Sequence, residues 1–154
     1  MEISGLADKH GISSIVLYKG FVYMITIAGR FVKNSQEIFL TSIQNPSTHD
    51  VSHYVQQIST GNGQLGVYSD RKDIEKLDIY VEKGYIYFQL IDSRSEWGCR
   101  EYINPKVSLS DNKTREVDQF SCTEATITRD IELVIRIINE FVTTNDVSEE
   151  LMPM

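Results

Sequence analysis

The most regular hydrophobic pattern in the chain runs from Thr126 to Thr143. Apolar residues recur there at steps of three and four, which is the spacing of one face of an α-helix. They are Ile131, Val134, Ile135, Ile138, Phe141 and Val142. Thr128 can cap the start of this helix, and Asp130 and Glu132 follow where the helix dipole favours negative charge. The apolar face is broad, so we expect a long C-terminal helix that lies across a sheet.

A second, shorter helix is predicted near residues 47–59. Ser47 can cap its start, and Asp50 stands three residues further on, as in a capping box. An apolar stripe then follows at helical spacing, formed by Val51, Tyr54, Val55 and Ile58. The glycines at positions 61 and 63 end this helix.

The clearest β-hairpin pattern covers residues 77–91, with a loop centred on Lys83 and Gly84. A loop of even length pairs Val81 with Ile86 and leaves the two faces of the hairpin chemically different, whereas an odd loop would mix them. One face carries Leu77, Ile79, Val81, Ile86, Phe88 and Leu90. The other carries Asp78, Tyr80, Glu82, Tyr85, Tyr87 and Gln89. We expect the first face in the core and the second, rich in tyrosine and carboxylate, on a surface typical of protein contacts, although tyrosines that merely cover a sheet would show the same pattern.

Other β-rich runs surround these elements. A hairpin hinged on Lys19 and Gly20 is predicted within residues 12–29. Further strands are predicted at residues 37–43, 64–68, 99–103, 106–109 and 115–120. The sequence therefore predicts one α+β domain over residues 1–154, with a mostly antiparallel sheet built from hairpins and covered by the two helices. Residues 1–11 and 145–154 are expected to be loosely ordered, with Leu151 and Met152 able to fold back against the body.

Charge and composition indicate which classes of molecule the protein is expected to bind. The formal net charge is −7 over 154 residues, and the acidic excess lies towards the C-terminus. This charge disfavours binding to nucleic acid and favours a basic partner, although it also serves solubility. The sequence shows no secretion signal and no apolar run long enough to span a membrane, and its two cysteines do not form a disulfide framework. We therefore expect a cytoplasmic protein that does not bind membranes.

Three local patterns suggest chemistry, but none has the context that the chemistry needs. Gly61, Gly63 and Gly66 match the letters of a dinucleotide fingerprint, yet a helix precedes them and a strand follows, which is the wrong order. His49 and His53 lie one helical turn apart, but a third metal ligand would have to be a carboxylate, and solvent-facing histidines explain the pair better. We expect no catalytic, cofactor-binding or metal-binding residues and no enzymatic activity.

The end of the chain carries a resemblance to a known class of proteins. The segment EFVTTNDVSEEL, with Phe141 and Thr144, resembles the close of small immunity proteins of bacterial polymorphic-toxin and contact-dependent growth inhibition systems. Asn145 stands where those proteins have a glycine, which is tolerated because Asn also adopts the left-handed conformation. Their terminal tryptophan is absent here.

The resemblance implies a cytoplasmic α+β protein that binds a cognate toxin domain, a nuclease or deaminase with a basic cleft, and blocks its active site. We expect the contact set to contain carboxylates and aromatic residues of residues 70–97. These are Asp70, Asp73, Glu75, Asp78, Tyr80, Glu82, Tyr85, Tyr87, Asp92, Glu96 and Trp97. The protein is then a monomer or a homodimer. The alternative is an acidic secretion chaperone or a small dimeric adaptor.

Overall fold

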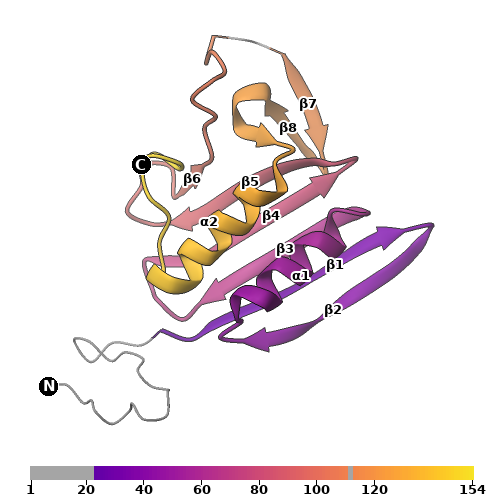
Figure 1. The fold of residues 1–154 in the computed structure, drawn as a ribbon. Helices are drawn as coiled ribbons and strands as arrows, with labels where there is room; N and C mark the ends of the chain where they lie inside the picture. The colour runs from indigo at the N-terminus through magenta and orange to yellow at the C-terminus, as the bar shows by residue number, and fades with distance from the viewer. Residues whose placement is uncertain (1–22, 111–112) are drawn as a thin grey trace, which may run out of the picture.

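The structure is a computed structural model that describes residues 23–110 and 113–154 (Figure 1). Its main elements follow one another in the order β1 (Ile25–Lys33), β2 (Gln36–Gln44), α1 (Thr48–Ile58), β3 (Asn62–Ser69), β4 (Ile74–Glu82), β5 (Tyr85–Asp92), β6 (Cys99–Glu101), β7 (Thr114–Val117), β8 (Phe120–Thr123), η4 (Glu124–Thr126), β9 (Ile127–Thr128) and α2 (Ile131–Thr144). The predicted α+β class, with two helices and a mostly antiparallel sheet, is confirmed.

In the part of the chain that the structure describes, seven strands form one antiparallel sheet in the order β2-β1-β3-β4-β5-β6, and β9 pairs with β5 as well. The β4–β5 hairpin has the predicted register, with Val81 opposite Ile86 and Leu77 opposite Leu90. Lys83 and Gly84 both have positive φ values, 53° and 82°, which match the right-handed strand twist in a two-residue turn. The turn chemistry and the alternation of apolar residues therefore act together to fix this register.

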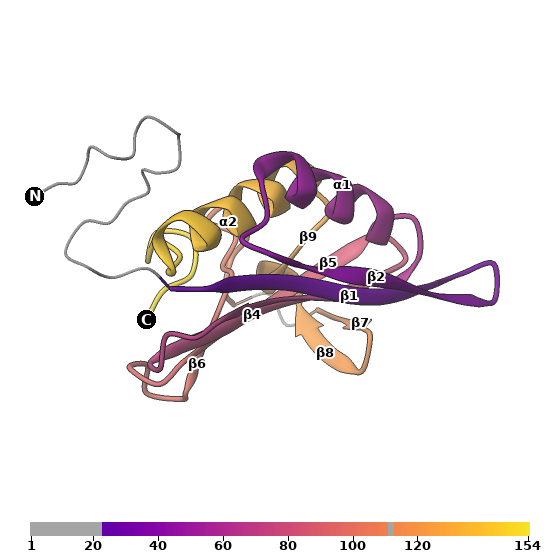
Figure 2. The ribbon, with the colours of Figure 1, turned by 90° about the horizontal axis from the view of Figure 1, so that it is seen from below.

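Both helices cover the same face of the sheet (Figure 2). Their buried residues, including Val51 and Phe141, form one core cluster with the inward residues of β1, β3, β4 and β5. Ser47 caps α1 in the predicted capping box, since its Oγ accepts from Asp50 N at 3.0 Å and Asp50 Oδ2 accepts from Ser47 N at 2.9 Å. The predicted roles of Ser47 and Asp50 are thus confirmed.

The opposite face of the sheet is only half covered. The β7–β8 hairpin lies below the sheet (Figure 2) and packs Val117, Cys122 and Phe120 against Tyr80 and Tyr87. The part built from β2, β1 and β3 carries exposed apolar side chains instead. Their sequence neighbours are buried in the core on the helix side, so they point away from the helices. They are Met24, Val32, Phe39 and Tyr68.

Several boundaries differ from those predicted. The hairpin predicted within residues 12–29 lies largely outside the described residues, and β1 instead pairs with β2 through a turn at Asn34 and Ser35, both with positive φ. Residues 106–109 form turns and not a strand. The predicted strand 115–120 is a hairpin, because Asp118 adopts a positive φ of 58° and reverses the chain after β7. The long helix begins at Ile131 with Asp130 as its cap, because residues 126–128 are taken up by η4 and β9.

The C-terminal residues are packed against the body, contrary to the loose order expected for residues 145–154. Asn145 adopts the left-handed conformation, with φ 60° and ψ 27°, and ends α2 as expected. Val147 and Met152 are buried in the core, and Leu151 folds back with them as expected. In the described part of the chain, no helix is long and apolar enough to cross a membrane.

Candidate functional site

The most exposed aromatic residue of the described chain lies in the loop between β5 and β6. Trp97 is 83% exposed, and Glu96 beside it is also exposed. A large aromatic side chain left in water at this level contributes nothing to the core, because most of its apolar area remains hydrated. The side chain of Trp97 is therefore available for contact with a partner.

The loop that carries Trp97 is held by its own hydrogen bonds. Ser95 N donates to Asp92 O at 3.1 Å, and Gly98 N donates to Ser95 O at 3.1 Å. Ser95 Oγ donates to Cys99 O at 2.8 Å, and Asp92 N donates to Gly98 O at 3.0 Å. Gly98 has a φ of +77°, a conformation that side chains rarely adopt. The tryptophan is thus presented on a fixed backbone.

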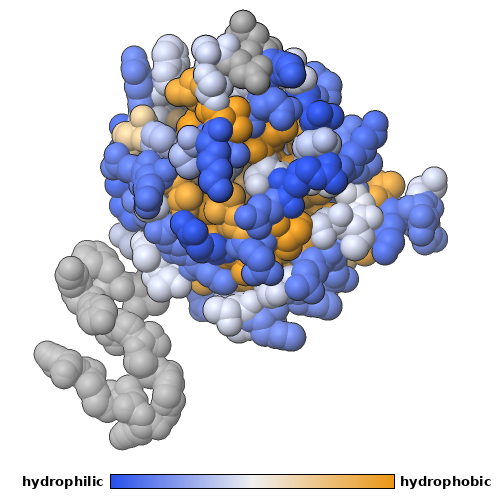
Figure 3. Space-filling view, turned by 45° about the horizontal axis from the view of Figure 1, so that its top comes forward, coloured by the Kyte–Doolittle hydropathy of each residue, from blue (hydrophilic) through white to orange (hydrophobic). Residues whose placement is uncertain are grey.

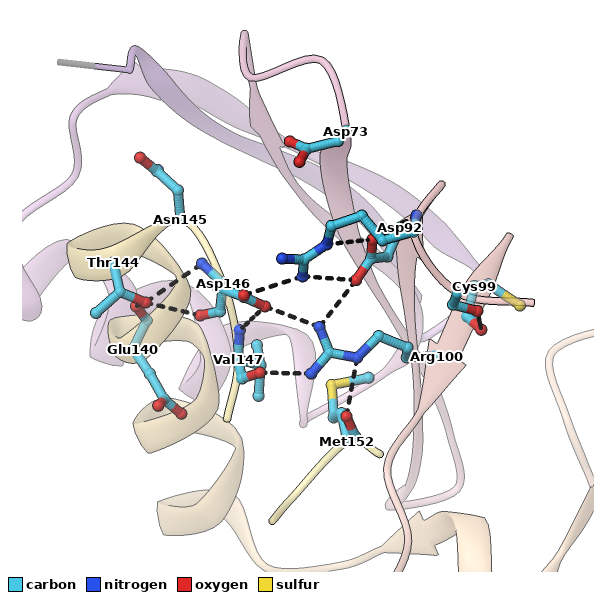
Figure 4. A network of polar contacts seen from close by, with 12 residues as sticks. Asp73, Asp92, Cys99, Arg100, Glu140, Thr144, Asn145, Asp146, Val147 and Met152 are labelled. Atoms are coloured by element: carbon cyan, nitrogen blue, oxygen red, sulfur yellow. Dashed lines mark hydrogen bonds and ion pairs between the residues drawn. The ribbon is translucent and has the colours of Figure 1, made fainter. Parts of the chain in front are cut away.

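A buried network of charges anchors this loop to the C-terminal segment (Figure 4). Arg100 is fully buried and bonds Asp92 Oδ2 at 3.0 Å and Asp146 Oδ1 at 2.8 Å. Its Nε donates to Met152 O at 2.9 Å and its Nη2 to Val147 O at 2.6 Å. The guanidinium therefore holds the end of the chain against β6.

A second arginine completes the network from the loop side. Arg94 donates to both oxygens of Asp92, at 2.9 and 2.8 Å, and its Nη2 also donates to Asp146 Oδ2 at 3.0 Å. The pKa of Asp92 is lowered to about 2, first by the side-chain hydrogen bonds from Arg94 and then by the Arg94 N–H and by Arg100, which outweigh burial. Burial raises the pKa of Asp146, but hydrogen bonds from Arg100, Val147 N and Arg94 lower it overall. Both carboxylates are therefore charged and matched by the two arginines.

The β3–β4 loop lies beside the Trp97 loop. Ser93 N donates to Asp73 O at 2.9 Å, which joins the two loops at one end of the sheet. Asp73 pairs with Arg71 at 2.6 Å, and this hydrogen bond lowers the pKa of Asp73. Asp70 and Glu75 are exposed at the same end. We call the exposed set formed by Asp70, Glu75, Glu96 and Trp97 the Trp97 surface.

The eleven residues predicted as contacts fall into three groups. The exposed group is Asp70, Glu75, Glu96 and Trp97. The partly buried group is Asp73, Glu82 and Tyr85. The buried group is Asp78, Tyr80, Tyr87 and Asp92, with exposures between 0% and 7%. The structure thus brings only part of the predicted set together on a free surface.

The expectation that the tyrosine face of the β4–β5 hairpin is exposed is wrong, because the β7–β8 hairpin covers it. Phe120 packs on Tyr80 and Tyr87, with ring centroids 4.7 and 5.3 Å apart. Burial, together with the nearby Asp78 carboxylate, raises the pKa of Tyr80 to about 12. The pKa of Tyr87 is also raised, mainly by burial and then by its hydrogen bond to Glu101.

Other predicted carboxylates are also engaged within the fold, since Asp70 Oδ1 accepts from Met24 N at 3.0 Å and Asp78 pairs with Lys76 at 3.1 Å. Glu82 accepts a hydrogen bond from Asp118 N at 2.6 Å, in the turn of the covering hairpin. Asp92 is buried in the arginine network described above. Sequence reasoning missed Arg100, whose only signal was a charged residue in a predicted strand.

The two histidines of α1 are exposed, with stacked rings whose centroids are 6.3 Å apart. In residues 23–110 and 113–154, no group of three or more His, Cys, Asp or Glu side chains lies where it could hold a metal ion. The glycines at positions 61, 63 and 66 lie before and within β3. Gly63 and Gly66 thus belong to a sheet strand and do not precede a helix.

In the described residues, the fold is α+β, with a seven-stranded antiparallel sheet, two helices on one face, the β7–β8 hairpin on the other face and a tryptophan-bearing loop at one end. The chain belongs to a family described as a family of unknown function (DUF6911), whose profile matches residues 24–151. A crystal structure of a hypothetical protein from Neisseria gonorrhoeae has a similar fold, with a TM-score of 0.64 and 23% identity over 82% of this chain and 91% of that chain. No curated protein matches the sequence.

Proposed function

We propose that this protein is an immunity protein that binds a cognate bacterial toxin domain in the cytoplasm and neutralises it by covering its active site. The observation that carries the proposal is Trp97, 83% exposed on a hydrogen-bonded loop with an exposed carboxylate beside it. The resemblance of the C-terminal segment to immunity proteins supplies the class of partner.

The geometry of Trp97 suits a residue that dominates a protein interface. Tryptophan buries a large area with only two rotatable side-chain bonds, and it is enriched among the residues that carry most of the binding energy. The loop is already ordered by bonds from Ser95 and Gly98, so little backbone entropy is lost on binding.

The charge of the protein supports a basic partner. The net charge is −7, and Asp70, Glu75 and Glu96 place exposed carboxylates at the same end of the sheet as Trp97. A nuclease or deaminase that acts on nucleic acid presents a basic cleft to phosphate groups. Carboxylates on an inhibitor can occupy that cleft and speed the encounter through long-range attraction.

The test begins with the gene neighbourhood, where we expect a gene directly upstream for a large exported protein with a variable C-terminal domain, and that domain is the expected toxin. Co-expression of the two should restore growth, and the purified domains should form a complex in calorimetry. Trp97→Ala should weaken that complex by about 30-fold, which corresponds to the roughly 2 kcal/mol lost at a typical interface hot spot. Leu109→Ala is the matched control, because Leu109 is also highly exposed, at 73%, but lies in the turns before β7.

The experiment with these two variants tests the immunity function and the assignment of the Trp97 surface separately. If the wild-type protein neither binds nor neutralises the neighbouring domain, the immunity function is wrong. If it does both and Trp97→Ala behaves like Leu109→Ala, the function stands and the assignment of the Trp97 surface is wrong. Both variants should keep the wild-type circular dichroism spectrum, since both residues lie outside the core clusters.

A further inference from the structure

A polar cleft lies on the side of the sheet opposite the helices, between the β1–β2 hairpin and the turn of the β7–β8 hairpin. The tip of the β1–β2 hairpin projects from the body in the space-filling view (Figure 3). The cleft has a volume of about 130 Å³, and its lining includes Arg30, Val32, Glu37, Asn62, Gln64 and Asp118. A cavity of about 150 Å³ holds a benzene molecule, so this cleft has room for the end of one side chain.

The floor of the cleft is the outer face of β1 and β3. Arg30 is paired across the strands with Gln64, and Val32 is paired with Asn62. Val32 is 44% exposed and gives this floor an apolar part. The side chain of Asn62 is held in place, because its Oδ1 accepts from Lys83 N at 2.9 Å.

The turn of the β7–β8 hairpin forms one wall of the cleft. Asp118 N donates to Glu82 Oε1 at 2.6 Å, which ties this turn to β4. The exposed carboxylate of Asp118 makes no hydrogen bond or ion pair with any residue that the structure describes. The half-buried side-chain amide of Gln64 also makes no hydrogen bond within residues 23–110 and 113–154. The cleft therefore contains a carboxylate and an amide whose hydrogen-bonding groups are unused.

The charges around the cleft favour a cationic ligand. Among the described residues that line it, Arg30 is the one cation, and it pairs with Glu37 at 2.6 Å. Asp118 is left without a counter-ion, and the carboxylate of Glu82 lies beside it. A basic side chain placed here gains an ion pair, whereas an acidic side chain is repelled.

We propose that this cleft binds the side chain of an arginine on a protein partner. A guanidinium group has five N–H donors in a planar fork, so it can donate to the Asp118 carboxylate and to the Gln64 amide oxygen together. The methylene groups of the same arginine can pack on the exposed side chain of Val32. The partner thus places both the charged and the apolar part of one side chain on matching groups.

For the identity of the partner, this inference rests on the proposed function, in which the partner is a basic toxin domain. The cleft and the Trp97 surface lie at opposite ends of β4, which has nine residues and is about 30 Å long. A standard interface buries about 800 Å² on each partner, which corresponds to a disc roughly 30 Å across. One toxin domain can therefore contact both sites.

A nuclear magnetic resonance titration of the isotope-labelled full chain tests the recognition of arginine without the toxin. The probe is Nα-acetyl-L-arginine amide, and its control is the citrulline analogue, which has nearly the same shape but no charge. The arginine probe should shift the signal of the Gln64 side-chain amide saturably, with a dissociation constant in the millimolar range expected for so small a ligand. The citrulline probe should bind at least about tenfold more weakly, because hydrogen bonds between charged groups are stronger.

A pair of variants tests the role of the Asp118 carboxylate. Asp118→Asn should keep the turn, because asparagine also adopts the positive φ of 58° found at this position. It should raise the dissociation constant of the arginine probe about tenfold and abolish its advantage over the citrulline probe. Glu116→Gln is the matched control, because Glu116 is an exposed carboxylate of the same hairpin outside the cleft, and it should change neither value. If Asp118→Asn does not fold, Asp118→Gly serves in the same assay, since glycine also suits this φ.

The inference and the proposed function can fail separately. The absence of a saturable shift up to about 50 mM of the arginine probe, or equal binding of the two probes, overturns the inference. If the toxin domain binds and Asp118→Asn affects that complex no more than Glu116→Gln does, the immunity function stands and the arginine site is wrong. If the arginine probe binds as expected but no toxin domain does, the arginine site stands and the immunity function is wrong.

Discussion

Replacement of Arg100 by methionine should be the most damaging single change in the arginine network. Arg100 has no exposed side-chain surface and bonds four acceptors, namely two carboxylates and the carbonyls of Val147 and Met152. Methionine fills much of the space of the side-chain stem but donates no hydrogen bond. The two carbonyls then lose their donor, and Asp92 and Asp146 lose one of their two cations.

The size of the effect follows from these losses. Breaking a buried ion pair by removing one partner costs about 3–5 kcal/mol, and each buried polar group left unpaired costs about 1–3 kcal/mol. Arg94 remains bonded to both carboxylates, which limits the damage. We therefore expect Arg100→Met to lower the free energy of unfolding by about 4 kcal/mol, a large part of the roughly 5–15 kcal/mol that stabilises a typical domain.

Urea unfolding followed by far-ultraviolet circular dichroism measures this change. Trp97 fluorescence is a poor probe, because Trp97 is already exposed in the folded protein. With a urea dependence of about 2 kcal/mol per molar, the midpoint should fall by about 2 M. Arg30→Met is the matched control, because Arg30 forms a 2.6 Å ion pair with Glu37 but is 61% exposed. It should cost no more than about 1 kcal/mol.

Comparison of the urea midpoints of the two variants tests whether burial is the reason that the arginine network stabilises the fold. If Arg100→Met and Arg30→Met shift the midpoint equally, the buried network does not stabilise the C-terminal segment as argued. A loss below about 1 kcal/mol in Arg100→Met would refute the same reasoning, since one unpaired buried carbonyl alone should cost that much.

Two further expectations follow from the same end of the molecule. The pKa of Asp92 is lowered to about 2, so its ionisation stabilises the fold above about pH 4, and about 2 kcal/mol of that stability should be lost as the pH falls towards 2. Asp92→Asn should flatten the fall of the urea midpoint over this window, and an unchanged slope would show that other carboxyls control acid unfolding. Asn145 holds a left-handed conformation at the end of α2, so Asn145→Ala should cost about 1 kcal/mol, or roughly 3 °C in melting temperature, whereas Asn145→Gly should lie within about 0.5 kcal/mol of wild type. Equal melting temperatures for these two variants would contradict the conformational argument.

The elements with strong local signals were predictable from the sequence. The capping box of Ser47 and Asp50, the stripe of α1 and the turn at Lys83 and Gly84 each depend on residues within a few positions of one another. The alternation of apolar and polar residues then fixes the register of the β4–β5 hairpin, because a slip by one residue would turn the apolar face towards solvent. The β1–β2 turn at Asn34 and Ser35 lacks glycine, so its sequence gives a weak turn signal, and this turn was not predicted.

The candidate site depended on contacts that no local pattern contains. Tyr80 and Tyr87 alternate like exposed residues of a half-buried strand, but Phe120 covers them from more than 30 positions away in the sequence. Arg100 is buried because the chain end returns to it, 46 and 52 positions later, with Asp146 and Met152. The exposure of Trp97 likewise depends on what the rest of the chain leaves uncovered.

The sequence by itself determined the secondary structure near its clearest caps and turns, the α+β class and the acidic balance of charge. The tertiary structure alone decided which face of the sheet stays in water, which carboxylates are neutralised by arginine, and that Trp97 is exposed. The physical reason is that burial and ion pairing are properties of segments brought together from distant parts of the chain, whereas helix caps, turns and periodicity are properties of neighbours.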